Sequence, residues 1–156
     1  MCLSSVCTSA GMAWVFHQQN ATSGVDASCV ALEQPQSNCM FAEHTMKHVS
    51  TPLFALQSQY DSWQTQFDLG SANAALINQW GRNLTTRVRE NLLSQHGMFL
   101  DSCHHHCGDW GYIFVSGDNQ PAAFEKWYRE EAQREWVQDA PYPCRCLIKD
   151  NSTTVC

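Results

Sequence analysis

Two short stretches decide the fold: TPLFALQSQYD at residues 51–61 and GMFLDSCHHHC at residues 97–107. The first opens with a continuous apolar run, 51–56, of the kind found in a strand buried on both faces. Pro52 stands at the start of that run, where a strand tolerates a missing N–H. A similar, shorter apolar run opens the second stretch. The sequence therefore predicts two buried strands, each followed by groups that can carry chemistry.

Between these strands, apolar residues recur at helical spacing. They are Leu76, Ile77, Trp80, Leu84, Val88 and Leu92, while Arg82, Arg87, Arg89 and Glu90 fall largely on the other face. A strand, helix, strand succession is typical of a parallel crossover. We expect an α/β fold, with a parallel sheet, flanking helices and disulfide-stapled loops.

The flanking regions give weaker patterns. Residues 1–50 are predicted to be irregular, and 112–115 form another apolar run. Asp118 or Asn119 can cap a helix that has Pro121 in its first turn. We expect this helix to continue to 141–143, with a buried aromatic stripe of Phe124, Trp127, Tyr128 and Trp136.

Composition limits the function classes. The chain has 156 residues, 44% of them hydrophobic, which fits a single domain over 1–156 with a sizeable core. A formal charge of −6 has the wrong sign for binding nucleic acid or an anionic membrane surface. No apolar run reaches the roughly 18 to 20 residues that span a bilayer, so no membrane insertion is expected.

Nine cysteines indicate an oxidising compartment, secreted or lumenal. Three N-x-S/T sequons, at Asn20, Asn83 and Asn151, point the same way. Cys29 and Cys39 are close enough in sequence to staple a loop. The N-terminus lacks the basic and apolar regions of a secretory signal, so we expect the chain to begin inside a longer protein. Oligomeric state is not predicted.

The groups that follow the two strands are Asp61 and the run His104 to His106. Ligand sites of parallel sheets lie at the carboxyl ends of strands, and imidazole, with a pKa of about 6.5, exchanges protons near neutrality. In α/β-hydrolases the acid precedes the histidine in this order. Two alternatives remain. Asp61 could only cap a turn beside a disulfide loop, or the histidines could bind zinc with Cys103 or Cys107, although consecutive ligands rarely converge on one ion.

Four segments resemble the pectin acetylesterase family of plants, which includes the Wnt-deacylating carboxylesterase Notum. Residues 50–64 and 97–107 are most similar, the latter to a Gly-Met-Phe-Ile-Asp-Ser-Cys-x-x-His-Cys pattern; 38–41 and 142–144 fall in family order. The resemblance covers roughly residues 12–146. It implies the C-terminal portion of an α/β-hydrolase-type domain.

Carried over onto this sequence, the resemblance implies Asp61 and His106 as the catalytic acid and base, and structural disulfides at Cys103 and Cys107. The family's nucleophile stands in a Gly-Cys-Ser-Ala-Gly-Gly turn. The nearest match here, around Ser9, lacks the first and last glycines that such a turn needs. The serine is therefore expected either at Ser9 or upstream of this chain.

We thus expect a serine carboxylesterase that deacetylates an O-acetylated polysaccharide such as pectin, or another acyl ester, with neither cofactor nor metal. The alternative is an incomplete or degenerate member that only binds. A zinc-binding module is the third hypothesis.

Overall fold

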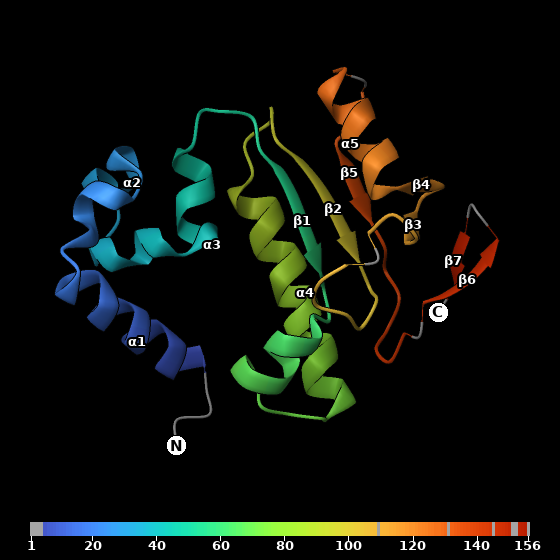
Figure 1. Ribbon diagram of the computed structural model, residues 1–156, viewed down its shortest axis with the longest axis horizontal. Coiled ribbons are helices and arrows are strands. Elements are labelled where there is room, and N and C mark those ends of the chain that lie inside the picture. The colour runs from blue at the N-terminus through green and yellow to red at the C-terminus, as the bar shows by residue number, and fades with distance from the viewer. Residues whose placement is uncertain (1–4, 109, 131, 145, 151–152, 156) are drawn as a thin grey trace.

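Three parallel strands form the main sheet in the order β1–β2–β5, as the computed structural model shows (Figure 1). The structure describes residues 5–108, 110–130, 132–144, 146–150 and 153–155. Strand β1 is Phe54–Ser58, β2 is Gly97–Asp101 and β5 is Glu135–Val137. Phe54 pairs with Gly97, and Phe99 pairs with Trp136. The predicted α/β class with a parallel sheet is confirmed.

Both predicted strands are present. β2 matches its prediction closely and is buried along its whole length. β1 begins two residues after Pro52, because a proline cannot donate a hydrogen bond to the ladder. Both strands run toward the same edge of the sheet, so their following loops meet there.

Helix α4 (Ala74–Asn91) makes the predicted crossover between β1 and β2. Asn73 caps it, because its side chain accepts hydrogen bonds from the backbone N–H groups of Ala75 and Leu76. Ile77 is buried as predicted, but Leu76 is 47% exposed, which corrects the predicted stripe. The two residues lie 100° apart on a helix, so only one of them can point directly at the sheet.

Gly81 brings α4 against the end of β1. A Cβ atom at this position would lie 2.5 Å from Cε1 of Tyr60, so only glycine allows the observed approach. The Tyr60 hydroxyl lies 3.0 Å from Asn78 Oδ1 and 2.9 Å from the Ala140 carbonyl oxygen. Burial raises the pKa of Tyr60 above its ordinary value. Tyr60 thus fixes the chain immediately before Asp61.

The second long helix ends earlier than predicted. Helix α5 (Gln120–Tyr128) begins with the expected cap at Asn119 and has Pro121 in its first turn. Its predicted extension to 141–143 is wrong, because Glu130 adopts a left-handed conformation and Trp136 lies in β5. Phe124 and Tyr128 are exposed, so the helix contributes Trp127 alone of the predicted stripe to the core. Pairing with β2 overrides the helical pattern after residue 130.

The prediction of an irregular segment over residues 1–50 is also wrong, because short helices fill most of it. They are α1 (Ser5–Gln18), η1 (Ala21–Gly24), α2 (Ala27–Leu32), η2 (Gln36–Met40), α3 (Ala42–Thr45) and η3 (Met46–His48). The expected Cys29–Cys39 pair is bonded, and both residues are buried. An ion pair between Arg87 and Glu43 links α4 to α3.

Glu33 is the centre of a cluster of charged and polar contacts near the end of this helical segment. Its carboxylate lies 2.6 Å from Lys47 Nζ, 3.3 Å from His48 Nε2 and 3.2 Å from His44 Nδ1. The hydrogen bonds from Lys47 and then His48 lower the pKa of Glu33 to about 2. The cluster therefore joins the end of α2 to α3 and η3.

Two small hairpins complete the described chain. One is β3 (Phe114–Val115) with β4 (Asp118–Asn119), and the other is β6 (Leu147–Asp150) with β7 (Thr153–Val155). Figure 1 places the second hairpin at the opposite end of the long axis from α1–α3. The core lies between the sheet and α5 and contains Phe99, Cys103, Ile113, Val115, Ala123, Trp127 and Trp136.

Candidate active site

The loops after β1 and β2 meet at the carboxyl edge of the sheet. The backbone N–H of Ser62 donates to the His105 carbonyl at 2.9 Å, and the Ser58 hydroxyl donates to the Cys103 carbonyl. These bonds tie the loop containing Asp61 to the loop containing the histidines. The structure thus brings together the two groups that the sequence placed after successive strands.

Asp61 is buried, with only 5% of its surface exposed. Its Oδ1 accepts hydrogen bonds from the backbone N–H groups of Trp63 and Gln64, each at 2.9 Å. It therefore caps the helical turn that continues as η4 (Gln64–Asp68). The same carboxylate also contacts His106, so capping a turn and orienting a histidine are roles that this side chain combines.

His106 Nδ1 lies 2.8 Å from Asp61 Oδ2 and 3.0 Å from Oδ1. A carboxylate can only accept, so Nδ1 carries the proton in this pair and the neutral ring keeps Nε2 as an acceptor. The His106 side chain is 48% exposed, whereas that of Asp61 is 7% exposed. A buried carboxylate thus orients an accessible imidazole, an arrangement suited to general-base chemistry.

A second Asp–His pair lies beside the first, and the sequence analysis did not predict it. His105 Nε2 lies 3.2 Å from both carboxylate oxygens of Asp101, at the end of β2. Asp101 is completely buried, and the His105 side chain is only 11% exposed. Asp101 Oδ1 also accepts from the Cys103 backbone N–H at 2.8 Å. Because the segment after β2 is not helical, the spacing of Asp101 and His105 gave no signal for this contact.

His104 points to a third environment. Its Nε2 lies 3.3 Å from Thr65 Oγ1, and its ring packs edge-on against Tyr142 with centroids 5.4 Å apart. The three consecutive histidines therefore have three different partners. The zinc hypothesis requires the three rings to converge on one point, but they diverge.

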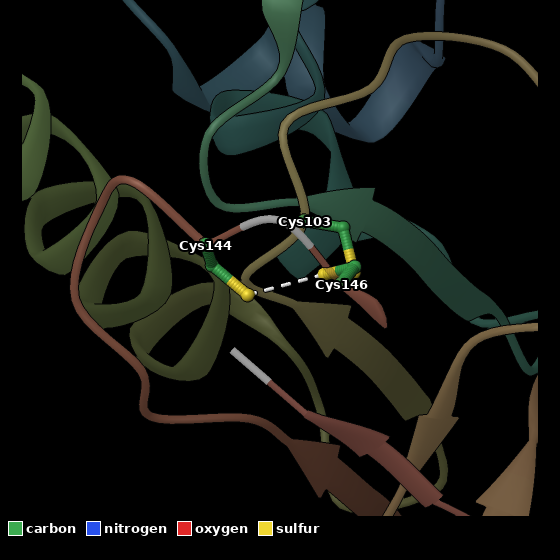
Figure 2. A group of neighbouring side chains, drawn as sticks. All are labelled: Cys103, Cys144 and Cys146. Carbon is green, nitrogen blue, oxygen red and sulfur yellow. Dashed lines mark hydrogen bonds between the residues drawn. A yellow bond between two sulfur atoms is a disulfide. The ribbon is translucent and has the colours of Figure 1, made fainter. Parts of the chain in front are cut away.

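A disulfide between Cys103 and Cys146 anchors the histidine loop to the C-terminal segment. Figure 2 shows the Cys144 sulfur beside this bond, 3.2 Å from Cys146 Sγ. These three sulfur atoms form a compact cluster. The expected structural role of Cys103 is confirmed, but the disulfide expected for Cys107 is wrong. Cys107 is exposed and free.

Ser9, the local candidate for the nucleophile, lies inside α1 and is exposed. A nucleophile elbow is a sharp turn between a strand and a helix. The Ser-Ala-Gly match therefore does not adopt the conformation that the family motif requires. In Figure 1, α1 lies on the other side of α4 from the histidine loop.

Fold and site together define an α/β protein that places an acid and a histidine after neighbouring parallel strands. This chain belongs to the pectinacetylesterase family, whose model matches residues 4–85. The matched region contains α1–α3, β1, Asp61 and most of α4. The match ends before the histidine loop.

Plant relatives extend the similarity further along the chain. Pectin acetylesterase 5 of Arabidopsis thaliana is 27% identical over 160 residues, covering 83% of this chain and 37% of the relative. Pectin acetylesterase 4 of the same plant is 26% identical, covering 81% of this chain and 37% of its own length. The chain thus spans well under half the length of these relatives.

Two surface features bear on the compartment predicted from sequence. Asn20 and Asn83 are exposed, as glycan attachment requires, and Asn151 lies outside the described residues. Within the described part of the chain, no helix has both the length and the apolar character needed to cross a membrane.

Proposed function

We propose that this chain is the C-terminal portion of a serine carboxylesterase that removes acetyl groups from an O-acetylated polysaccharide such as pectin. The observation that carries the proposal is the Asp61–His106 pair, with Nδ1 2.8 Å from the carboxylate and the ring half exposed. Membership of the pectinacetylesterase family supports the acetyl ester as substrate.

The proposed reaction begins with attack of a serine hydroxyl oxygen on the acetyl carbonyl carbon. Nε2 of His106 takes the hydroxyl proton and returns it to the sugar oxygen as the carbon–oxygen ester bond breaks. Water then attacks the acetyl-enzyme, again giving a proton to His106, and acetate leaves as the serine is restored. Asp61 stabilises the imidazolium that forms in each half of the reaction.

The part of the family domain that precedes this segment supplies the serine in this proposal. Ser9 lies within a helix, and the chain spans 37% of the length of two relatives. The oxyanion-hole donors belong to the same missing part, and a single such donor can contribute on the order of 10² to 10³ in rate. The segment alone is therefore expected to be much less active than the complete gene product.

We further propose that the protein acts outside the cell or in the secretory lumen. The disulfides Cys29–Cys39 and Cys103–Cys146 support this compartment. Glycans at Asn20 and Asn83 are expected there.

A second candidate function is binding without turnover. The helical conformation at Ser9 favours it, because the only local serine match does not form an elbow. In that case the chain would recognise an acylated glycan but release no acetate. A single measurement distinguishes the two functions.

That measurement is acetate release from acetylated pectin by the complete gene product, compared with its His106→Ala variant. We expect a loss of about 10⁴-fold or more in kcat for His106→Ala, as for the removal of a triad histidine. His17→Ala is the matched control, because His17 is exposed on α1 and contacts neither Asp61 nor Asp101 in the described structure. Unchanged turnover in His106→Ala would exclude the assignment, and absence of release by the unmodified protein would favour binding.

A further inference from the structure

Two exposed aromatic side chains lie next to the proposed catalytic histidine. Trp63 is 45% exposed and Phe67 is 52% exposed, and their ring centroids are 5.3 Å apart. The Trp63 ring also stacks near the His106 ring, with centroids 6.1 Å apart and planes inclined by 27°. Together the three rings form a continuous surface that ends at the imidazole.

Asp61 holds this aromatic surface close to the His106 ring. Its carboxylate binds the backbone N–H of Trp63 and the Nδ1 of His106 at the same time. Phe67 follows Trp63 by four residues, so both rings project from the same side of the helical turn. An ester that reaches Nε2 of His106 therefore approaches within contact range of this aromatic surface.

The opposite side of the same turn is polar. A pocket of about 380 Å³ lies there, and its polar lining consists of Ser62, Thr65, Gln66, Ser71, His104 and Tyr142. Among the described residues, no carboxylate, lysine or arginine lines it. Hydroxyl and amide groups in this pocket suit a ligand rich in hydroxyls.

The acetyl group and the alcohol part of the ester need binding surfaces of different shape. An acetyl group has only two carbons and needs a small enclosed space, whereas Trp63 and Phe67 present open, flat faces. A pyranose ring has a flat face of C–H bonds, which packs well on the electron-rich face of an aromatic ring. An aromatic surface beside the base and a polar pocket across the turn therefore match a carbohydrate chain.

We propose that Trp63 and Phe67 form a carbohydrate-stacking subsite that holds the pyranose ring bearing the ester beside His106. This inference rests on the proposed esterase function and adds the residues that select its alcohol part. Both residues determine specificity through direct contact with the sugar.

The test compares two esters in the complete gene product, an acetylated galacturonate oligosaccharide and ethyl acetate, which has no ring. We expect Trp63→Leu and Phe67→Leu each to lower the ratio of kcat/KM for the oligosaccharide to that for ethyl acetate by roughly 2- to 13-fold. Phe67→Leu is the sharper variant, because Phe67 has no described contact with Asp61 or His106. Trp14→Leu is the matched control, since Trp14 is 64% exposed on α1.

A binding measurement separates failure of the subsite from failure of the esterase function. Titration calorimetry with a deacetylated galacturonan oligosaccharide, which cannot turn over, should give a Kd raised in both variants and unaltered in Trp14→Leu. Weaker binding in these variants, with no turnover of either ester by the unmodified protein, would retain the subsite and exclude the esterase. An unchanged Kd and an unchanged ester ratio would overturn the subsite, as would an equal loss with both esters.

Discussion

The two Asp–His pairs at the carboxyl edge of the sheet contain the same groups in different surroundings. In the Asp61–His106 pair the imidazole is 48% exposed, whereas in the Asp101–His105 pair it is 11% exposed and its carboxylate is completely buried. Proton transfer to a substrate requires access, so exposure favours the first of these two pairs for the proposed base. The buried second pair links the end of β2 to the histidine loop, and we expect it to stabilise that loop. This difference in exposure is the basis of the different roles that we propose for the two pairs.

Removing the Cys103–Cys146 disulfide, which anchors the loop that carries both histidines, should have the largest effect on stability. Replacing Cys103 and Cys146 together with serine should lower the free energy of unfolding by about 2–5 kcal/mol, because the bond closes a loop between residues 43 apart in sequence. Denaturant unfolding under oxidising conditions measures this. Replacing the exposed, free Cys107 with serine is the control, and equal losses in the two variants would contradict a special role for the Cys103–Cys146 bond.

Substitutions of the two histidines test most directly how the two pairs differ. His105→Ala should lower the free energy of unfolding by about 2–4 kcal/mol, because it removes a hydrogen-bond partner from the buried Asp101 carboxylate. His106→Ala should lower it by less than about 1 kcal/mol, since that pair is partly screened by solvent. Urea titrations of both variants check the difference. A larger loss for His106→Ala would reverse the proposed division of roles.

A smaller effect is expected where α4 meets the chain before Asp61. Gly81→Ala should lower the free energy of unfolding by about 1–2 kcal/mol, because the added Cβ would overlap the buried Tyr60 ring. The overlap outweighs the gain in helix propensity. Thermal unfolding tests this, with Gln79→Ala on the exposed face of α4 as the control. A more stable Gly81→Ala variant would show that the Tyr60 ring moves aside readily.

The smallest effect concerns Glu33, far from both pairs in sequence. Its folded pKa, about 2, lies below the ordinary value of 4.5, so its contribution to stability is complete above pH 4.5 and is lost as the pH falls toward 2. The difference in unfolding free energy between the unmodified protein and Glu33→Gln should therefore shrink as the pH falls from 4.5 toward 2. Urea titrations across this range measure it. A difference that grew between pH 4.5 and 2 would contradict the cluster.

The sequence predicted those features that depend on local pattern. Continuous apolar runs gave β1 and β2, and helical spacing gave α4, as the structure confirms. Family motifs selected Asp61 and His106, and the structure places these side chains in contact. Their catalytic roles remain a prediction.

The missed features depend on contacts distant in sequence. Trp136 fitted a helical stripe, but pairing with β2 makes it part of a strand. The helices of residues 5–48 are short, and a buried disulfide and the Glu33 cluster organise them, so periodicity was a weak guide. The Asp101–His105 contact lies in a segment that is not helical, so which of the three adjacent histidines turns inward depends on the packing of two loops.

One measurement tests the central claim that Asp61 acts through His106. Steady-state kinetics of acetate release should be compared for Asp61→Asn, His106→Ala and the double variant of the complete gene product. Because the two residues form one unit, the double variant should be no slower than His106→Ala alone. If the losses in kcat of the single variants multiply in the double variant, the two residues act independently and the account is wrong.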